Sequence, residues 1–409
     1  MALGSADPPA RAARSPAPLW LLILISTVAP TAMNMYVPAL AGMQADLTTS
    51  VGAMQLTLSV FLAFLAIGAV ISGPISDIFG RRPIFIAGFT LYLAATVLCA
   101  LAPNVETLIA GRLLQAIGGC VSLSLTRAII RDLHGAENSA AMIGAVTMGM
   151  AVAPLLTPLL GGLIYEAAGW RMIFVTMAIL GAAALALVIV RFDETHPGEL
   201  QPGIGARFRA EVIDLLSLRD FWAFAGTLGL LCMAFFSILA AGAFVAVDVY
   251  NLGAAQYGLY FVMIVAGYVF GNFIVARYGP RIGIVPMIKI GNVICLCGVS
   301  LSIILTSVVG WAHPLALFGP MLIVGVGNGF ALPNLIAACV SLRPHLAGTA
   351  SGLAGMFQFG SGALTGVVAG WIIDTGWQQG TVWPLLGLLT FGIVACLALS
   401  LTLHGENLR

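Results

Sequence analysis

Residues 73–83 of the chain read GPISDIFGRRP, a short charged segment between two long apolar stretches. Gly73 and Gly80 permit a sharp turn and a close approach of two helices, because glycine has no side chain. The pair Arg81 and Arg82 would hold such a turn at the inner surface of a membrane, where basic residues concentrate. The segment therefore predicts a tight, charged turn between two membrane-spanning helices.

The composition of the whole chain also indicates a membrane protein. Of its 409 residues, 60% are hydrophobic and 8% are charged, which leaves too little polar surface to coat a soluble globule. The formal net charge of +1, without a basic run, argues against nucleic acid as a partner. The seven cysteines lie within or at the ends of apolar stretches and are expected to be core residues. We expect no metal and no cofactor.

The basic residues follow the apolar stretches in an alternating pattern. Fifteen of the seventeen fall on every second connection, and the exceptions are Arg112, inside a stretch, and Arg171, on the opposite side. By the positive-inside rule, the favoured side is the cytoplasm. The fifteen are Arg11, Arg14, Arg81, Arg82, Arg127, Arg131, Arg191, Arg207, Arg209, Arg219, Arg277, Arg281, Lys289, Arg343 and Arg409.

A helix needs about 20 residues to cross the hydrocarbon layer, and this length predicts twelve spans with both termini in the cytoplasm. The expected spans are 18–41, 52–76, 83–102, 106–130, 138–165, 170–191, 221–247, 256–276, 285–307, 314–341, 348–373 and 382–403. The fold class is thus an all-α membrane protein. Its expected parts are a disordered N-terminus (1–17), an N-terminal six-helix bundle (18–191), a polar linker (192–220), a C-terminal six-helix bundle (221–403) and a short tail (404–409).

The two halves repeat each other. GPISDIFGRRP between spans two and three has a weaker counterpart in ARYGPRIG (276–283) between spans eight and nine. Span five carries Gly161 and Gly162, and span eleven carries glycines at four-residue spacing, a pattern that lets helix backbones pack closely in lipid. Such a repeat is typical of transporters built from two related bundles around a central site.

Three motifs resemble signatures of the major facilitator superfamily. GPISDIFGRRP resembles the signature between spans two and three, in which Asp77, Gly80, Arg81 and Arg82 would act in gating. LIAGRLLQAIGG (108–119) resembles the second signature. GMAVAPLLTPLLGG (149–162) is similar to the signature of the antiporter members, with Ala153 where a glycine commonly stands. The resemblance implies two pseudo-symmetric six-helix bundles.

Arg112 lies in the second of these motifs, about two turns below the outer surface. An arginine at a helix centre costs about 2.5–3.5 kcal/mol on insertion scales, so it usually faces a polar cavity or a partner. Gln115 lies on the same helical face. The alternative is an arginine that extends to the outer headgroups.

The paired prolines of span five, Pro154 and Pro158, remove backbone donors and bend the helix. A bent helix suits a surface against which two bundles rock, so both prolines are expected to act in gating. An ordinary kinked span is the alternative.

The stretches NMYVPALAGMQADL (34–47), QLTLS (55–59) and RAIIRDL (127–133) make the chain look like the Bcr/CflA drug-exporting branch of the superfamily. The resemblance covers nearly the whole first half and thins in the second. It implies drug export in exchange for protons across a bacterial inner membrane, by a multi-pass protein that we expect to be monomeric.

One position departs from that pattern. Many relatives have an aspartate in the first span where this chain has Asn34, and an amide cannot carry a proton. No acidic residue lies in the middle of any expected span. In order of preference, the coupling group would be Asp248, Arg112 through an exchange of partners, or none if transport is uncoupled.

Polar and soft side chains on apolar helices are the candidates for a substrate site, because a lipid-facing surface does not need them. Amides both donate and accept hydrogen bonds, while Met and Phe offer a deformable apolar wall. Such a lining fits small amphiphilic compounds better than sugars or phosphates. The candidates are Asn34, Tyr36, Gln55, Arg112, Gln115, Met148, Phe235, Phe236, Asn328, Met356 and Gln358.

Other functions remain open at this point. The exporter could serve one endogenous metabolite, such as an amino acid or a siderophore-like product. A membrane sensor without transport is less well supported, because the linker and tail are too short for a signalling segment. No cluster suited to acid–base or nucleophilic catalysis is visible, so an enzyme is not expected.

Overall fold

The computed structural model of the protein describes residues 18–150, 152–196, 198, 203–310, 312–378 and 380–403. The side chains of residues 131, 134–141, 143–145, 147, 148, 204 and 280 also lie outside this description. The N-terminus expected to be disordered (1–17) and the expected tail (404–409) thus fall outside the described residues.

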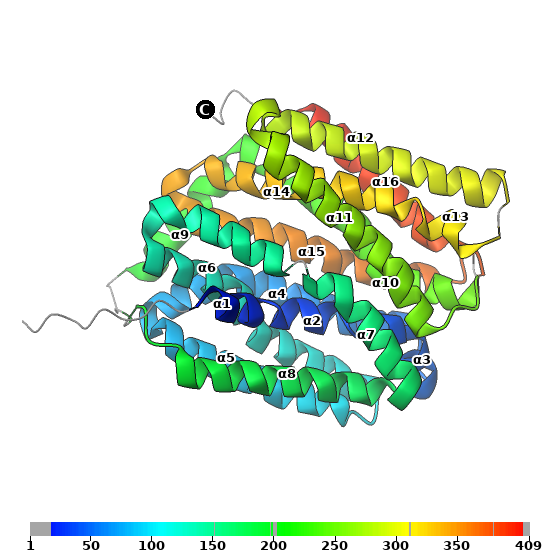
Figure 1. Ribbon diagram of the computed structural model, residues 1–409, viewed down its shortest axis with the longest axis horizontal. Coiled ribbons are helices and arrows are strands. Elements are labelled where there is room, and N and C mark those ends of the chain that lie inside the picture. The colour runs from blue at the N-terminus through cyan, green and yellow to red at the C-terminus, as the bar shows by residue number, and fades with distance from the viewer. Residues whose placement is uncertain are drawn as a thin grey trace, which may run out of the picture.

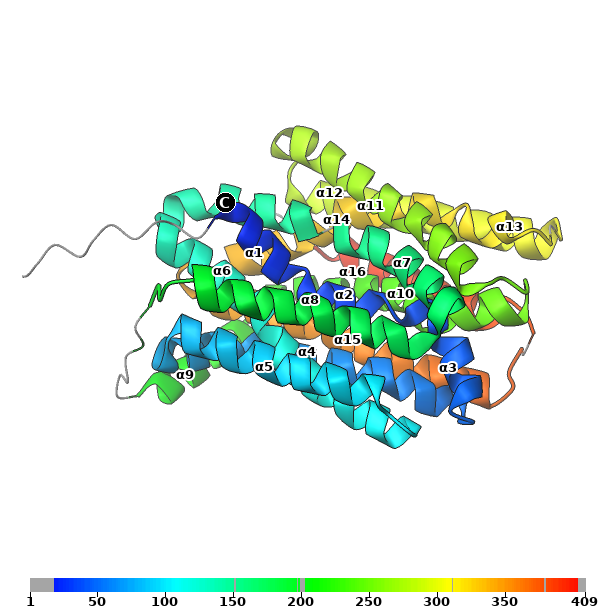
Figure 2. The same cartoon turned by 60° about the horizontal axis from the view of Figure 1, so that its bottom comes forward.

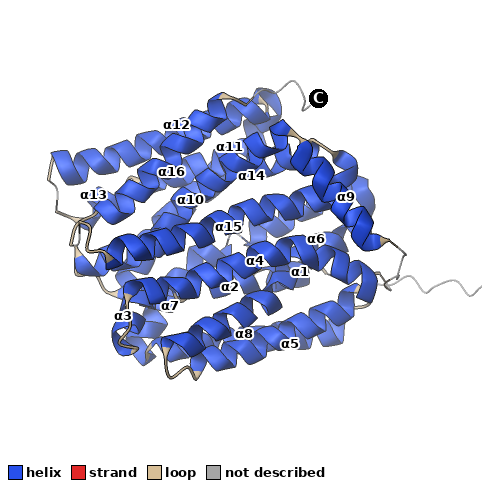
Figure 3. Ribbon diagram, turned by 180° about the vertical axis from the view of Figure 1, so that it is seen from behind, coloured by secondary structure: helices blue, strands red, loops and turns tan. Residues whose placement is uncertain are grey.

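The described residues form helices and no strands (Figure 3). The first half contains α1 (Leu19–Ser26), α2 (Val28–Asn34), η1 (Val37–Ala39), α3 (Leu40–Asp46), α4 (Val51–Phe79), α5 (Arg81–Ala100), α6 (Val105–Met150), α7 (Val152–Ala168) and α8 (Trp170–Arg191). After α9 (Ile204–Ser217), the second half contains α10 (Arg219–Asp248), α11 (Ala254–Ile282), α12 (Ile284–Ile303), η2 (Ile304–Val308), α13 (Pro314–Phe318), α14 (Met321–Ser341), η3 (Pro344–Leu346), α15 (Ala347–Asp374) and α16 (Trp383–Leu401).

Among the described residues, eleven helical segments are long and apolar enough to cross a membrane, and α7 is a shorter apolar helix. Helix α7 covers only the later part of the expected fifth span. The earlier part continues α6, because residues 104–153 contain no proline that would stop that helix. The count of twelve spans therefore stays a prediction.

The expected first span is interrupted rather than continuous. Helix α1 ends at Ser26 and α2 begins at Val28. Pro30 lacks the N–H that would bond to the Ser26 carbonyl, and Pro38 lies in the short 3-10 turn η1. The backbone of this span therefore bends twice, which places Asn34 and Tyr36 at the second bend.

The two tight turns predicted by the internal repeat adopt the same backbone conformation. Gly80 joins α4 to α5 with φ +91° and ψ 156°, and Gly283 joins α11 to α12 with φ +90° and ψ 163°. Side chains rarely tolerate this positive φ, so glycine is required at both turns. Matching turns in matching places support the relation between the halves.

The two halves lie side by side, with α1–α8 along one side of the molecule and α10–α16 along the other (Figure 1). Across the boundary, α4 packs along α15 and α7 packs along α11. Helices α5 and α8 pack together on the outside of the first half (Figure 2). Where the sequence predicted a polar linker, α9 lies across one end of the bundle and contacts α10 and α15.

Candidate substrate-binding cavity

A cavity of about 1640 Å³ lies between the two halves. Its walls come from α4, α6 and α7 on one side and from α11, α14 and α15 on the other, with α9 at its margin. The volume exceeds the roughly 300–1,000 Å³ of an ordinary small-molecule pocket, so a drug-sized compound fits with room for water. The cavity is displaced toward the end of the bundle that carries the α4–α5 turn, here called the Arg81 end.

The lining combines apolar walls with a few polar groups. Apolar side chains include Leu65, Val70, Val269, Ile336, Val340 and Phe359. Neutral polar groups include Ser124, Tyr268, Asn272, Thr349, Ser351 and Gln358. Charged or titratable groups include Asp77, Arg81, Arg127, Asp132, His196, Arg207 and Glu211. This mixture suits an amphiphilic ligand.

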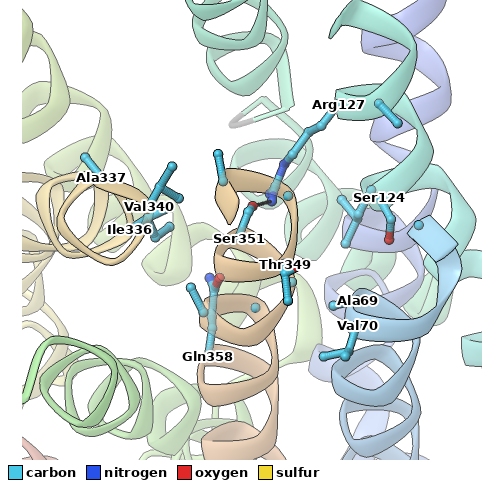
Figure 4. A pocket seen from close by; sticks show the side chains of 18 of the residues that line it. Ala69, Val70, Ser124, Arg127, Ile336, Ala337, Val340, Thr349, Ser351 and Gln358 are labelled. Carbon is cyan, nitrogen blue, oxygen red and sulfur yellow. Dashed lines mark hydrogen bonds between the residues drawn. The ribbon is translucent and has the colours of Figure 1, made fainter. Parts of the chain in front are cut away.

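Arg127 is the charged side chain of α6 that reaches from the wall of the cavity toward the opposite half (Figure 4). Its Nη1 donates to Ser351 Oγ on α15 at 2.9 Å. Gln358 lies on the same helix, two turns beyond Ser351. A hydrogen bond inside the cavity therefore joins the two halves.

The α4–α5 turn at the Arg81 end is tied down by charged contacts. Arg81 forms ion pairs with Asp77 at 2.7 Å and with Asp132 at 3.0 Å. The carboxylate of Glu194 accepts hydrogen bonds from the backbone N–H groups of Arg81 and Arg82, at 2.9 and 3.1 Å. An anion at these exposed N–H groups stabilises the start of α5.

Of the two glycines that the sequence assigned to that turn, Gly80 forms the turn, whereas Gly73 lies inside α4. Gly80 adopts a positive φ, and a side chain there would meet the Glu194 carboxylate at 2.8 Å. Gly73 instead lines the cavity, and a Cβ there would meet nothing within 4 Å. The close helix approach expected at Gly73 is absent, because the cavity separates α4 from the second half at this point.

The opposite end of the bundle, here called the Glu166 end, is sealed by two similar contacts. Glu166 Oε1, at the end of α7, accepts a hydrogen bond from Ala255 N at the start of α11, at 2.9 Å. Asp374 Oδ2, at the end of α15, accepts one from Gly52 N at the start of α4, at 2.8 Å. Each carboxylate belongs to one half and caps a helix of the other half.

Glycines bring the helix backbones together beside these caps. A Cβ at Gly162 would lie 2.5 Å from the carbonyl oxygen of Ala254, and one at Gly370 would lie 2.8 Å from Gly52 Cα. A Cβ at Gly258 would lie 2.7 Å from the Pro158 carbonyl oxygen. The close packing expected at the small-residue faces of spans five and eleven is therefore found, and it lies between the halves.

Arg112 is fully buried inside the first half and does not line the cavity. Its guanidinium lies between the rings of Tyr36 and Phe61, with Cζ 4.2 and 4.0 Å from the two centroids. Its Nη1 donates to Ala32 O at 2.9 Å and to Gln115 Oε1 at 2.5 Å. Burial excludes an arginine that extends to the headgroups.

Asn34 and Gln55 are also buried, and neither lines the cavity. The Asn34 side chain donates to Pro30 O at 2.8 Å, while its Oδ1 has no partner among the described residues. Gln55 donates to Ala240 O of the other half, near the Glu166 end. The hydrogen bonds of Tyr36, Arg112 and Gln115 thus stay within the first half, Asn34 bonds within α2, and Gln55 joins the halves.

The remaining predicted substrate residues are dispersed. Gln358 lines the cavity, whereas Met356 on the same helix is 45% exposed and outside the cavity lining. Phe235 and Phe236 pack together with ring centroids 5.6 Å apart, and Asn328 is buried in α14. The Met148 side chain lies outside the described residues. The role of these residues in substrate binding stays a prediction.

Of the predicted gating residues, Asp77 and Arg81 line the cavity. Pro158 is buried and its carbonyl contacts α11 of the other half, while Pro154 is half-buried near the start of α7. Asp248 is exposed at the end of α10 and does not line the cavity.

Sequence reasoning missed most of the cavity lining, including Arg127 and the residues of α9. Arg127 was assigned to a connection between spans. Its position three residues inside the expected span 106–130 was the signal that this charged side chain belongs to the helix itself. The residues of helix α9 were expected to form a linker. The signal in the sequence was Phe208, an apolar residue between two arginines in an otherwise polar stretch. Arg127 and α9 both contribute side chains to the cavity.

Comparisons with known proteins cover both halves of the chain. A sequence model described as Major Facilitator Superfamily matches residues 22–366. The chain is 29% identical to a bicyclomycin resistance protein homolog of Haemophilus influenzae, over 86% of this chain and 88% of that protein. It is 30% identical to a chloramphenicol resistance protein of Pseudomonas aeruginosa, over 94% of this chain and 88% of that protein. These matches confirm the resemblance to the drug-efflux branch.

A solved structure with the same fold is a bacterial homolog of the human lysosomal transporter Spinster, in an inward-facing, unoccupied conformation. The TM-score is 0.70 at 16% sequence identity, and the match covers 94% of both chains.

Proposed function

Because the chain belongs to the major facilitator superfamily, a family of multi-pass membrane transporters and not of enzymes, we propose that it exports small amphiphilic drugs or metabolites from a bacterial cytoplasm in exchange for protons. The observation that carries the proposal is the cavity between the halves, which lies toward the Arg81 end while the Glu166 end is sealed. Alternating access requires such a central site with one closed end.

The distribution of basic residues supports the direction of transport. By the positive-inside rule, the Arg81 end faces the cytoplasm, and the Glu166 end faces outward across the inner membrane. A cavity that faces the cytoplasm is where an exporter loads its substrate. The twelve-span, two-bundle arrangement with both termini inside belongs to the same proposal.

The cavity lining supports the class of substrate. Apolar walls with scattered hydroxyl and amide groups bind varied amphiphilic molecules, because few of their contacts demand one geometry. Relatives named for bicyclomycin and chloramphenicol resistance favour drugs as the cargo. Growth inhibition by a panel of antibiotics, in cells with and without the protein, would separate drug export from export of one metabolite.

The proton carrier remains a proposal with three candidates. Asp248 comes first, as an exposed carboxylate near the outer side. Arg112 comes second, because its Nε and Nη2 have no hydrogen-bond partner among the described residues and can take up a new one. Uncoupled transport comes third, since Asn34 cannot titrate.

We expect efflux of a fluorescent amphiphilic dye from intact cells to stop when a protonophore collapses the proton gradient. Proton exchange would supply the driving force, so its removal should leave only passive leak. The measurement is dye retention over time, and cells without the protein give the leak rate. Efflux that persists after collapse would rule out proton exchange.

Removal of both acidic caps at the Glu166 end should shift the protein toward an outward-open state. A charge at a helix N-terminus contributes about 0.3–1 kcal/mol, so Glu166→Gln with Asp374→Asn should cost about 1–2 kcal/mol and shift the ratio of states about tenfold. Distances between spin labels at the exposed positions Leu101 and Val308 report the opening of this end.

Glu106→Gln is the matched control for the caps, because Glu106 is an exposed acid at the same end of the bundle. It should leave the label distances unchanged. An identical distance distribution in the double variant and the parent would show that the caps do not hold this end closed.

A further inference from the structure

Among the described side chains of α6, Arg127 is the arginine that lines the cavity, whereas the arginine expected from the sequence, Arg112, is buried in the first half. Both lie on α6, inside the same membrane-spanning segment. A guanidinium this close to the end of a span can extend to the membrane surface, but the Arg127 side chain instead reaches across the cavity toward α15. Because the Arg127 guanidinium is exposed to the cavity, it can bind a ligand there.

The other arginines of the cavity lining already have carboxylate partners. Arg81 pairs with Asp77 and Asp132, and Arg207 pairs with Glu211 at 3.3 Å. Within the described part of the chain, the Arg127 side chain bonds instead to a neutral hydroxyl, Ser351 Oγ, through one N–H. A guanidinium offers five N–H donors, so most of its hydrogen-bonding capacity faces the cavity.

The surroundings of Arg127 combine polar side chains, which suit the charged head group of a ligand, with apolar walls, which suit its hydrophobic body. Ser351 on α15 accepts a hydrogen bond from Arg127, and Gln358 lines the cavity two turns further along the same helix; both can hydrogen bond to a polar ligand. Val70 on α4 and Ile336 on α14 provide apolar walls across the same space (Figure 4). Among the described arginines of the lining, Arg127 alone has no carboxylate partner, and one such cation matches one negative charge rather than a polyphosphate.

We propose that this cavity preferentially binds amphiphilic monoanions, with the carboxylate or sulfonate on the Arg127 guanidinium and the apolar body against α4 and α14. A planar guanidinium binds a carboxylate through two parallel hydrogen bonds, which a neutral amide cannot reproduce. The inference rests on the proposed function, because it names the substrate class of the transport cavity.

The test compares three ligands that share a naphthalene body: 1-naphthylacetate, 1-naphthylacetamide and 1-naphthylmethylammonium. Binding is measured by calorimetry on the full chain in lipid nanodiscs, with empty nanodiscs subtracted. The parent should bind the acetate at least about tenfold more tightly than the amide or the amine, as expected for a charge-assisted bidentate pair.

Arg127→Gln should weaken acetate binding about tenfold or more and change amide binding less than about twofold. The control is Arg209→Gln, because Arg209 is an exposed arginine on α9 that does not line the cavity, and it should preserve the preference for the acetate. If Arg127→Gln fails to fold, Arg127→Lys is used as the test instead. A lysine keeps the charge but lacks the planar guanidinium, so it should weaken acetate binding several-fold and leave amide binding unchanged.

Equal binding of acid and amide by the parent, no binding of either, or an equal loss of both in Arg127→Gln would overturn the proposal. Failure here is distinguishable from failure of the proposed function. If the binding test fails but efflux of a neutral or cationic dye is sensitive to a protonophore, the proposed export function is supported and only the preference for anions is refuted.

Discussion

Gly162→Ala is expected to prevent the Glu166 end from closing. A Cβ at Gly162 would lie 2.5 Å from Ala254 O and 2.6 Å from Ala255 Cα, both backbone atoms of α11 in the opposite half. Backbone atoms cannot rotate away, so α7 and α11 must separate. Overpacking of this kind costs about 1–3 kcal/mol, which would shift the ratio of closed to open states by about five- to 150-fold.

The distance between spin labels at Leu101 and Val308 should therefore lengthen in Gly162→Ala, and the initial rate of dye efflux should fall about tenfold, because one of the two required states is depleted. Gly360→Ala is the matched control, since a Cβ at Gly360 meets nothing within 4 Å. Unchanged label distances in Gly162→Ala would mean that the α7–α11 contact does not set the closed state.

Arg112→Lys should lower both the stability and the transport rate, although it keeps the positive charge. The guanidinium stacks between Tyr36 and Phe61 and also bonds to Ala32 O and Gln115. An ammonium is a point charge without a face, so it loses the stacking. A lysine ammonium can still attract an aromatic ring, but without a planar face it cannot contact both rings as the guanidinium does; because each cation–π contact contributes about 0.5–2 kcal/mol, weakening both should lower the Tm by several degrees.

The measurements for this prediction are thermal unfolding of the purified protein and dye efflux, which should fall at least about tenfold if the first half must stay rigid. Arg171→Lys is the control, because Arg171 is half-exposed, lies over Trp170 and pairs with Asp46 at 3.2 Å. Exposed pairs contribute at most about 1 kcal/mol. A lysine at position 112 that matches arginine in both measurements would contradict the stacking argument.

Motifs that act locally were well predicted from the sequence. The turn at Gly80 was predictable from the sequence because a positive φ depends on one residue and its neighbours. The close helix approach at Gly162 was also predictable, because small residues on a helix in lipid mark a packing face. The sequence did not predict which helix packs against that face, since the partner lies in the other half.

Features set by several helices together were less predictable. Helix α9 was not expected, and its position depends on its packing against α10 and α15 at one end of the bundle. Gly73 was assigned to a close contact, yet it faces the cavity.

The sequence by itself determined that this chain is an all-helical membrane protein, because hydropathy and charge distribution are properties of each segment. Tertiary structure alone decided which arginine of α6 enters the cavity and which is enclosed by aromatic rings. Arg112 and Arg127 are 15 residues apart on one helix, and their different environments come from neighbouring helices that are distant in sequence. The physical reason is that burial is a property of the assembled bundle and not of the residue.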